Sequence, residues 1–161
     1  MKGIKTLVSA TAIAVCMGAA SMASAVTITS PAAGSAFTAP GTITVKSPAS
    51  FNLPVTCNIT FTGNVSSDSK TASITGATVS GSNSLCSVPV MQNLPWTLTP
   101  TSTTAAKVAG VSFKIVSNCG TADVTVAYTG GVLSLSPTPQ SVGSCSITAL
   151  SVTPSPTFVI Q

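Results

Sequence analysis

Few side chains in this sequence are of the types that carry acid–base, nucleophilic or metal chemistry. The 161 residues contain no His, and the charged residues are six Lys and two Asp, with no Arg and no Glu. The 50 Ser and Thr hydroxyls therefore have no imidazole to act as a general base. Nucleic-acid binding is disfavoured as well, because phosphate recognition needs clustered Lys or Arg. The composition predicts a protein that is not an enzyme, with no catalytic, cofactor-binding or metal-ligating residues.

Two catalytic arrangements remain formally open. One is a Ser–Lys pair, and the other is a pair of carboxylates formed by Asp68 and Asp123, as in glycoside hydrolysis. Lys70 follows Asp68 in a Ser-rich stretch typical of a solvated loop tip, and Asp123 lies near Gly120, as turn residues often do. We therefore interpret both aspartates as surface residues, together with the lysines Lys46, Lys70, Lys107 and Lys114.

The first 25 residues have the pattern of a secretory signal peptide. Lys2 and Lys5 precede an uncharged apolar stretch at 7–20, and Ala-Ser-Ala at 23–25 suits signal peptidase. An uncleaved membrane anchor is the alternative, but a span needs roughly 18 or more apolar residues. A lipid anchor on Cys16 would need a small residue where the sequence has Val15. We expect residues 1–25 to be a signal peptide and residues 26–161 to be the mature domain, secreted, extracellular or at the outer cell surface.

Four cysteines follow the signal peptide, and an even number in an exported chain predicts a disulfide framework. No Cys-x-x-Cys pair is present, which disfavours both a redox-active dithiol and a zinc site. Four cysteines allow three connectivities. The residues are Cys57, Cys86, Cys119 and Cys145.

A weak internal repeat favours one of these connectivities. Phe51 and Phe113, each preceded by Ser, stand at the same distance before Cys57 and Cys119. Each half then runs through a Thr-Gly pair to a second cysteine followed by Ser and a β-branched residue. Chance similarity is the alternative, because a chain rich in Ser, Thr and Val produces false matches. If the halves are equivalent, Cys57 pairs with Cys86 and Cys119 pairs with Cys145.

Apolar and polar residues alternate along much of the chain after residue 26. Clear examples are residues 55–62, 111–115 and 124–128, each typical of a strand with one buried face. Gly130-Gly131 suits a hairpin turn, and the apolar phase slips at Gly76, which indicates a β-bulge. We predict an all-β fold, a single antiparallel β-sandwich or barrel-like domain with two disulfides after the signal peptide.

Aromatic side chains are few, and most stand on apolar faces where we expect them in the core. Trp96 is less settled, because it ends an irregular, Pro-bounded stretch that includes Met91 and Leu94. This stretch either covers an open end of the fold or presents an exposed apolar patch. We take Met91, Leu94 and Trp96 as a possible apolar contact site. The aromatic residues are Phe37, Phe51, Phe61, Trp96, Phe113, Tyr128 and Phe158.

Several long segments follow a known pattern: residues 47–63 (SPASFNLPVTCNITFTG), 79–86 (VSGSNSLC), 93–100 (NLPWTLTP), 115–120 (IVSNCG) and 152–156 (VTPSP). They resemble the bacterial protein activator of alkane oxidation family (PraA/PraB-like) over nearly the whole chain that follows the signal peptide. The resemblance implies an exported protein that promotes growth on n-alkanes by helping cells contact or disperse the hydrocarbon. It implies links to biofilm and the cell surface, and it brings no catalytic residue.

Two functions follow as hypotheses. The first is an exported, non-catalytic accessory protein that promotes assimilation of n-hexadecane-type alkanes at the cell–hydrocarbon interface, where a surface with few charges leaves little charge to desolvate. The second is a structural cell-surface or biofilm matrix protein that self-assembles, because uncharged strand edges pair readily, and terminal strands at 27–29 and 158–160 could be donated to neighbours. Expected partners are a hydrocarbon or lipid-like interface or the cell surface, with possible self-association and no nucleic acid.

Overall fold

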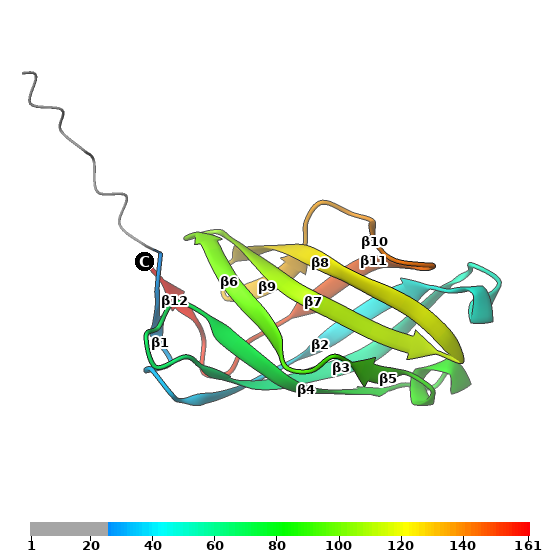
Figure 1. The fold of residues 1–161 in the computed structure, drawn as a ribbon, viewed down its shortest axis with the longest axis horizontal. Coiled ribbons are helices and arrows are strands. Elements are labelled where there is room, and N and C mark those ends of the chain that lie inside the picture. The colour runs from blue at the N-terminus through cyan, green and yellow to red at the C-terminus, as the bar shows by residue number, and fades with distance from the viewer. Residues whose placement is uncertain (1–25) are drawn as a thin grey trace, which may run out of the picture.

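The computed structural model describes residues 26–161, so the predicted signal peptide lies outside the described residues. The predicted all-β class is confirmed (Figure 1). No helix within residues 26–161 is long and apolar enough to cross a membrane. The elements are β1 (Ile28–Ser30), β2 (Ala36–Lys46), η1 (Pro48–Ser50), β3 (Pro54–Val65), β4 (Ala72–Ser80), η2 (Ser84–Ser87), β5 (Val90–Gln92), β6 (Trp96–Ser102), β7 (Ala105–Ile115), β8 (Ser117–Thr129), β9 (Val132–Leu135), β10 (Gln140–Val142), β11 (Cys145–Val152) and β12 (Val159–Ile160), where η marks a 3₁₀ helix.

Eight of these strands close into an antiparallel barrel. The order is β11-β2-β3-β4-β6-β7-β8-β9, and β9 returns to β11 through the pairs Ser151–Ser134 and Val152–Leu133. Of the two architectures expected from the sequence, the strand pairing therefore gives the barrel. Closure matters because it satisfies backbone groups that an open sheet would leave unpaired at its edges.

The alternation in the sequence sorts side chains between the interior and the surface. In β3, Cys57 and Ile59 are buried while Thr56 and Asn58 are exposed. The bulge expected at Gly76 is present, because Thr62 pairs with Gly76 while Gly63 pairs with Ile74. The turn at Gly130-Gly131 has φ values of 59° and 83°, which glycine adopts without a steric penalty.

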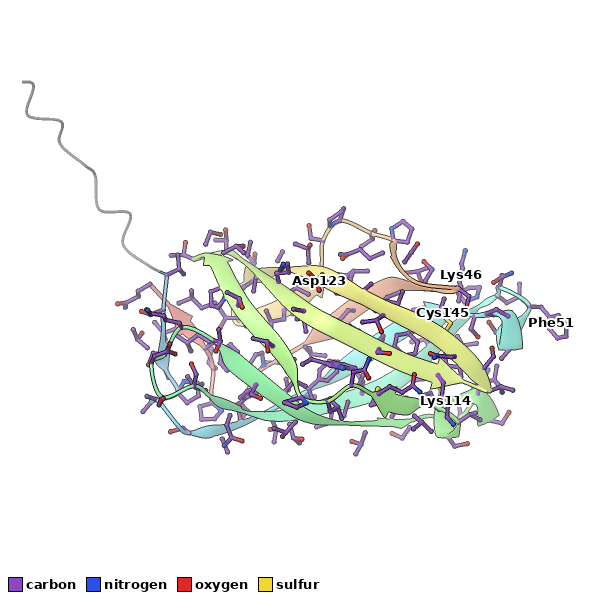
Figure 2. The ribbon with its side chains drawn as sticks, in the orientation of Figure 1. Lys46, Phe51, Lys114, Asp123 and Cys145 are labelled. Carbon is purple, nitrogen blue, oxygen red and sulfur yellow. A yellow bond between two sulfur atoms is a disulfide. The ribbon has the colours of Figure 1, made fainter. Side chains whose placement is uncertain are left out.

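The connections divide between two ends of the barrel. Because neighbouring strands are antiparallel, the connections 47–53, 81–89, 116 and 143–144 lie at one end, which we call the apolar end. Lys46, Phe51, Lys114 and Cys145 lie toward it (Figure 2). The opposite end carries β1 and β12, and we call it the closed end (Figure 1).

The closed end is sealed by packing. β1 pairs with β12, and Ile28 and Phe158 are almost fully buried. The Phe158 ring meets Phe37 edge-on with 5.0 Å between centroids, and the Tyr128 hydroxyl donates a hydrogen bond to the Phe158 carbonyl oxygen. The terminal strands that we expected to be available for donation to neighbours are thus paired with each other in this structure.

The barrel wall is interrupted at two places toward the apolar end. β6 pairs with β4 only over residues 72–74, so in the described structure residues 75–80 of β4 have no strand partner on that side. β9 pairs only with residues 126–129 of β8, which leaves residues 117–125 of β8 beside β10 and β11 without a continuous ladder. A disulfide lies at or beside each interruption.

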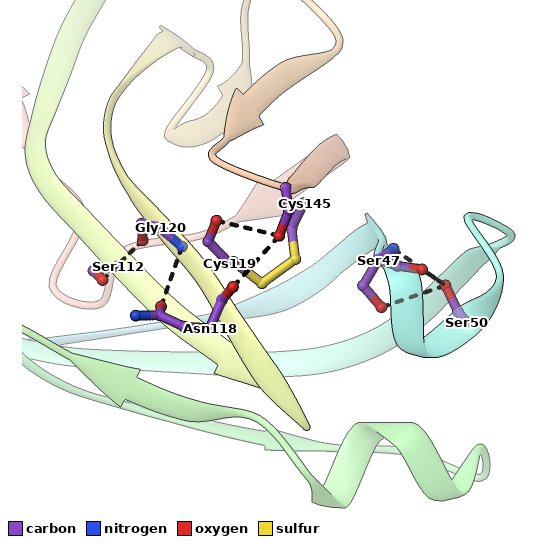
Figure 3. The surroundings of a disulfide bond; sticks show 8 residues. Ser47, Ser50, Ser112, Asn118, Cys119, Gly120 and Cys145 are labelled. Atoms are coloured by element: carbon purple, nitrogen blue, oxygen red, sulfur yellow. Dashed lines mark hydrogen bonds between the residues drawn. A yellow bond between two sulfur atoms is a disulfide. The ribbon is translucent and has the colours of Figure 1, made fainter.

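The first disulfide joins β3 to η2, the short helix in the connection after β4. Cys57 and Cys86 have a Cα–Cα distance of 5.6 Å. The second joins β8 to the start of β11, with 5.1 Å between the Cα atoms of Cys119 and Cys145 (Figure 3). These are the pairs that the internal repeat favours. The second bond joins two strands that the hydrogen-bond ladder does not join, whereas the first fastens the connection after β4 to β3.

Close backbone packing supports the second disulfide. The Ser144 N–H donates to the Cys119 carbonyl oxygen at 2.7 Å. Gly143 has a φ of 58°, and a Cβ there would collide with the same oxygen, so the position requires glycine. The Gln140 side chain adds bonds to the N–H and carbonyl of Thr125, both at 2.7 Å. Polar and backbone contacts therefore fill this interruption.

Candidate functional site

Large apolar side chains are exposed mainly at the apolar end. Phe51 and Leu53 in the β2–β3 loop are 89% and 65% exposed, Val116 between β7 and β8 is 72% exposed, and Val90 in β5 is 49% exposed. Figure 2 shows Phe51 pointing away from the barrel at its far end. The remaining large exposed apolar residue, Val159, lies in β12 at the closed end. Exposed apolar side chains gathered at one end of a soluble protein indicate an interaction surface.

Two buried serines build the loop that presents Phe51. The Ser50 hydroxyl lies 3.0 Å from the Ser47 carbonyl oxygen and 2.7 Å from that of Leu53, and it accepts the Ser47 N–H at 3.2 Å (Figure 3). The Phe51 N–H donates a hydrogen bond to the Pro48 carbonyl oxygen. Ser47 and Ser50 are thus buried and hydrogen-bonded within the loop, while Phe51 and Leu53 are left exposed.

The backbone is strained at two of the exposed apolar residues. Phe51 has a φ of 53° and Val116 a φ of 65°. Left-handed backbone is a genuine outlier for bulky and β-branched residues. Such strain costs on the order of 1–3 kcal/mol and clusters at functional positions. Glycine would avoid this strain, yet both positions carry a large exposed apolar side chain.

Charge is distributed unevenly over the barrel. Lys107 Nζ pairs with Asp123 Oδ2 at 3.0 Å in the wall, and this is the one ion pair within residues 26–161. Asp68 and Lys70 share the β3–β4 loop at the closed end. Lys46 and Lys114 lie toward the apolar end, which carries no carboxylate side chain. The apolar end is therefore cationic as well as apolar.

The two aspartates lie in separate elements and each completes a local arrangement. Hydrogen bonds from the Lys107 ammonium and from the Gly110 N–H lower the pKa of Asp123. A hydrogen bond from the Ser66 hydroxyl, followed by one from the Lys70 N–H, lowers the pKa of Asp68. The prediction that Asp123 is a turn residue is wrong, because it lies within β8 and accepts the N–H of Gly110 at a bulge in β7.

The interior of the barrel contains a cavity of about 90 Å³. Its lining comes from nearly every strand of the wall, and among the described lining residues only Ser47 is a Ser, Thr or charged residue. No buried side-chain nitrogen or oxygen of residues 26–161 lacks a hydrogen-bond partner. The cavity thus offers a ligand contact with carbon atoms and almost nothing else.

The three residues expected to form an apolar contact site are not placed alike. Trp96 is 3% exposed, and its Nε1–H donates to the Gln92 carbonyl oxygen at 2.8 Å, so of its two alternatives the structure shows burial. Met91 is half-buried and lines the cavity together with Trp96. Leu94 is half-buried and does not line it.

The exposed apolar loop was missed by sequence reasoning. We expected aromatic residues mostly in the core, and the repeat equated Phe51 with Phe113, yet Phe113 is 5% exposed in β7 while Phe51 is on the surface. The repeat therefore fails at this position. One available signal was that Phe51 lies between Pro48 and Pro54, outside the alternating run that begins at Val55.

Together the fold and these surfaces define a small β-barrel protein with two disulfides, in which the interior and one end are apolar. The model of the PraA/PraB-like alkane oxidation protein activator family matches residues 1–161, and the chain belongs to that family. No curated protein and no solved structure matches the chain. The family is named for activation of alkane oxidation, which is consistent with an accessory role. Two disulfides fit an extracellular or periplasmic protein.

Proposed function

We propose that this protein is an exported, non-catalytic accessory protein that promotes alkane assimilation by adsorbing at the hydrocarbon–water interface through its apolar end. The observation that carries the proposal is that Phe51, Leu53, Val90 and Val116 are all exposed at the same end of the barrel. The family name supports the link to alkanes.

Transfer of these side chains into oil removes apolar surface from water, at about 25 cal/mol per Å². Lys46 and Lys114 can lay their methylene stems along the oil while the ammonium groups stay in water. The rest of the wall exposes mainly hydroxyl and amide groups, as in Thr56 and Asn58 of β3. The protein therefore adsorbs in one orientation, with its apolar end in the hydrocarbon.

The disulfides suit this role because both lie toward the end that would enter the oil. An interface pulls apolar core residues out of a protein, and interruptions in a wall are where such unfolding would start. The Cys119–Cys145 bond crosses one interruption, and the Cys57–Cys86 bond fixes the connection beside the other, so both oppose such unfolding. The same links suit a secreted protein at the outer cell surface, which is the location we propose together with cleavage after Ala25.

The self-assembly hypothesis has weaker support. That hypothesis depends on strand edges that are free to pair with another molecule, and closure of the barrel pairs most strand edges within the molecule. Its proposed donor segments at 27–29 and 158–160 lie in or beside β1 and β12, which pair with each other.

A deletion strain tests the proposed function. We expect slower growth on hexadecane with unchanged growth on a soluble carbon source, and rescue by purified protein added to the medium. The triple variant Phe51→Ser, Leu53→Ser and Val116→Ser should not rescue, whereas Val159→Ser, which removes an exposed valine at the closed end, should. Equal rescue by both variants would reject the role of the apolar end, and failure of the wild type to rescue would reject extracellular action.

A further inference from the structure

The barrel interior is built as a binding site for a ligand without polar groups. The cavity of about 90 Å³ is lined by aliphatic and aromatic side chains, including Ile59, Trp96 and Phe113, and no charged residue reaches it. Water in such a site would lack the polar partners that ordered internal water needs. A polar ligand would lose its hydrogen bonds to water and gain none in return. A saturated hydrocarbon has no hydrogen bonds to water, so it is the ligand class that loses none on entering the cavity.

The wall of the cavity has no hydrogen-bond ladder where β4 and β5 lie apart. Residues 75–80 of β4 have no strand partner on this side, and β5 pairs with β7 instead. The wall here consists of the half-buried side chains of Val79, Leu85, Pro89 and Met91, all of which line the cavity. Side chains can rotate aside without breaking backbone hydrogen bonds, and Met is the most adaptable apolar residue.

The other interruption of the wall is not an entrance of this kind. Between β8 and β11 the space is crossed by the Cys119–Cys145 disulfide, by the hydrogen bonds of Gln140 and by the close contact at Gly143. The Cys57–Cys86 disulfide, by contrast, fixes η2 to β3 and leaves Met91 and Pro89 unlinked. Of the two interruptions, only the one between β4 and β5 is covered by apolar side chains alone.

The size of the cavity limits what it takes. An apolar cavity of about 150 Å³ binds benzene, and pockets for drug-sized ligands start at about 300 Å³. A cavity of about 90 Å³ therefore accepts a few methylene groups and not a whole long chain. A linear chain can enter end-on, place its last few methylene groups in the cavity and leave its remainder outside.

We propose that the barrel interior binds the terminal segment of one linear saturated hydrocarbon chain, which enters between β4 and β5. The proposal rests on the proposed function and gives it a ligand: adsorption at oil brings the apolar end to the hydrocarbon, and the cavity takes up single chain ends. The protein would then bind hydrocarbon in two ways: by adsorption of its apolar end, and by one saturable site in the barrel interior.

The single tryptophan of the chain reports on this site, because Trp96 lines the cavity. Dissolved 1-bromoalkanes, kept below their solubility limit, should quench its fluorescence with saturation. Each added carbon should tighten binding about fourfold while the cavity fills, after which the gain should stop. A charged bromide of similar size, 3-bromopropanesulfonate, should not quench. Quenching that rises linearly for all probes, with no dependence on chain length, would overturn the proposal.

Variants in β4 locate the entrance. Val79→Phe should fill the gap and weaken 1-bromohexane binding at least tenfold, whereas Thr78→Phe, on the exposed side of the same strand, should leave it unchanged. Equal affinity in the two variants would overturn the route. If Val79→Phe does not fold, Leu85→Phe serves instead, and the chain-length series on the wild type still decides whether the site exists.

These measurements separate the site from the proposed function. Saturable quenching without any effect on hexadecane interfaces would reject the interfacial role and keep the site. Lowered interfacial tension without saturable quenching would reject the site and keep the role.

Discussion

The two ends of the barrel use phenylalanine in opposite ways. At the closed end Phe158 is 2% exposed, packs on Phe37 and receives a hydrogen bond at its carbonyl from Tyr128. At the apolar end Phe51 is 89% exposed. Its backbone is left-handed, and the hydrogen bonds of two buried serines hold the loop in that conformation. One end is sealed by burying its apolar groups, and the other is built to display them.

The ends also differ in what holds them together. At the closed end two terminal strands pair and cover the core. Toward the apolar end the ladder is interrupted twice; one disulfide crosses the gap between β8 and β11, and the other fastens the connection after β4 to β3. If the apolar end meets the hydrocarbon, as we propose, it cannot be covered by its own chain, and the two disulfides supply part of the stabilisation instead.

The largest expected effect comes from truncating the two phenylalanines. Phe158→Ala should lower the free energy of unfolding by about 3–5 kcal/mol, because it empties a packed site. Phe51→Ala should change it by less than about 0.5 kcal/mol, as for most surface positions. Urea unfolding followed by Trp96 fluorescence measures both. Similar losses in the two variants would remove the contrast between the ends.

Loss of a disulfide should rank next. Replacing Cys119 and Cys145 by Ala should cost about 3.5 kcal/mol in the loop-closure model, given a separation of 26 residues. Hydrogen exchange in the variant should speed up in β8 and β11 near the apolar end while β1 and β12 stay protected. Uniform acceleration over the whole barrel would mean that the bond does not act locally.

Val116→Gly should act in the opposite direction. Glycine relieves the left-handed strain at φ 65°, so we expect a gain of about 1 kcal/mol in stability together with weaker adsorption to hexadecane droplets. Stability by urea unfolding and adsorption by depletion from the aqueous phase are read on the same sample. A variant that gains stability and adsorbs as before would show that Val116 is not displayed for contact with oil.

The smallest effect concerns pH. The pKa values of Asp68 and Asp123 are held below their ordinary value by hydrogen bonds, so their contribution to stability is present above the unfolded pKa and is lost as pH falls through the lower folded value. Both are exposed, so the loss should be slight and confined to pH below about 4. With no His or Glu in the chain, stability should otherwise be flat from pH 5 to about 9. Asp123→Asn should flatten the acid limb, and an unfolding transition near neutral pH would contradict this reasoning.

Local patterns in the sequence were sufficient for several strands and for one turn and one bulge. The alternation around Cys57, the turn at Gly130 and the bulge at Gly76 depend on neighbouring residues, and the structure has all three. Barrel closure was left open because it depends on the pairing of β9 with β11, which no local pattern encodes.

The candidate site was harder to predict for the same reason. Exposure of Phe51 depends on the backbone that Ser50 fixes, and aromatic type alone pointed to the core. The position of Asp123 depends on Gly110 and Lys107 in the neighbouring strand. The cavity arises from residues of nearly every strand, so it becomes visible only when the barrel is assembled.

Interfacial tension at a hexadecane–water interface tests the central claim most directly. The wild-type protein and Val159→Ser should lower the tension equally, and the triple variant Phe51→Ser, Leu53→Ser, Val116→Ser should lower it far less at the same concentration and with the same unfolding free energy. Equal activity of all three proteins would contradict the assignment of the apolar end as the surface that meets the hydrocarbon.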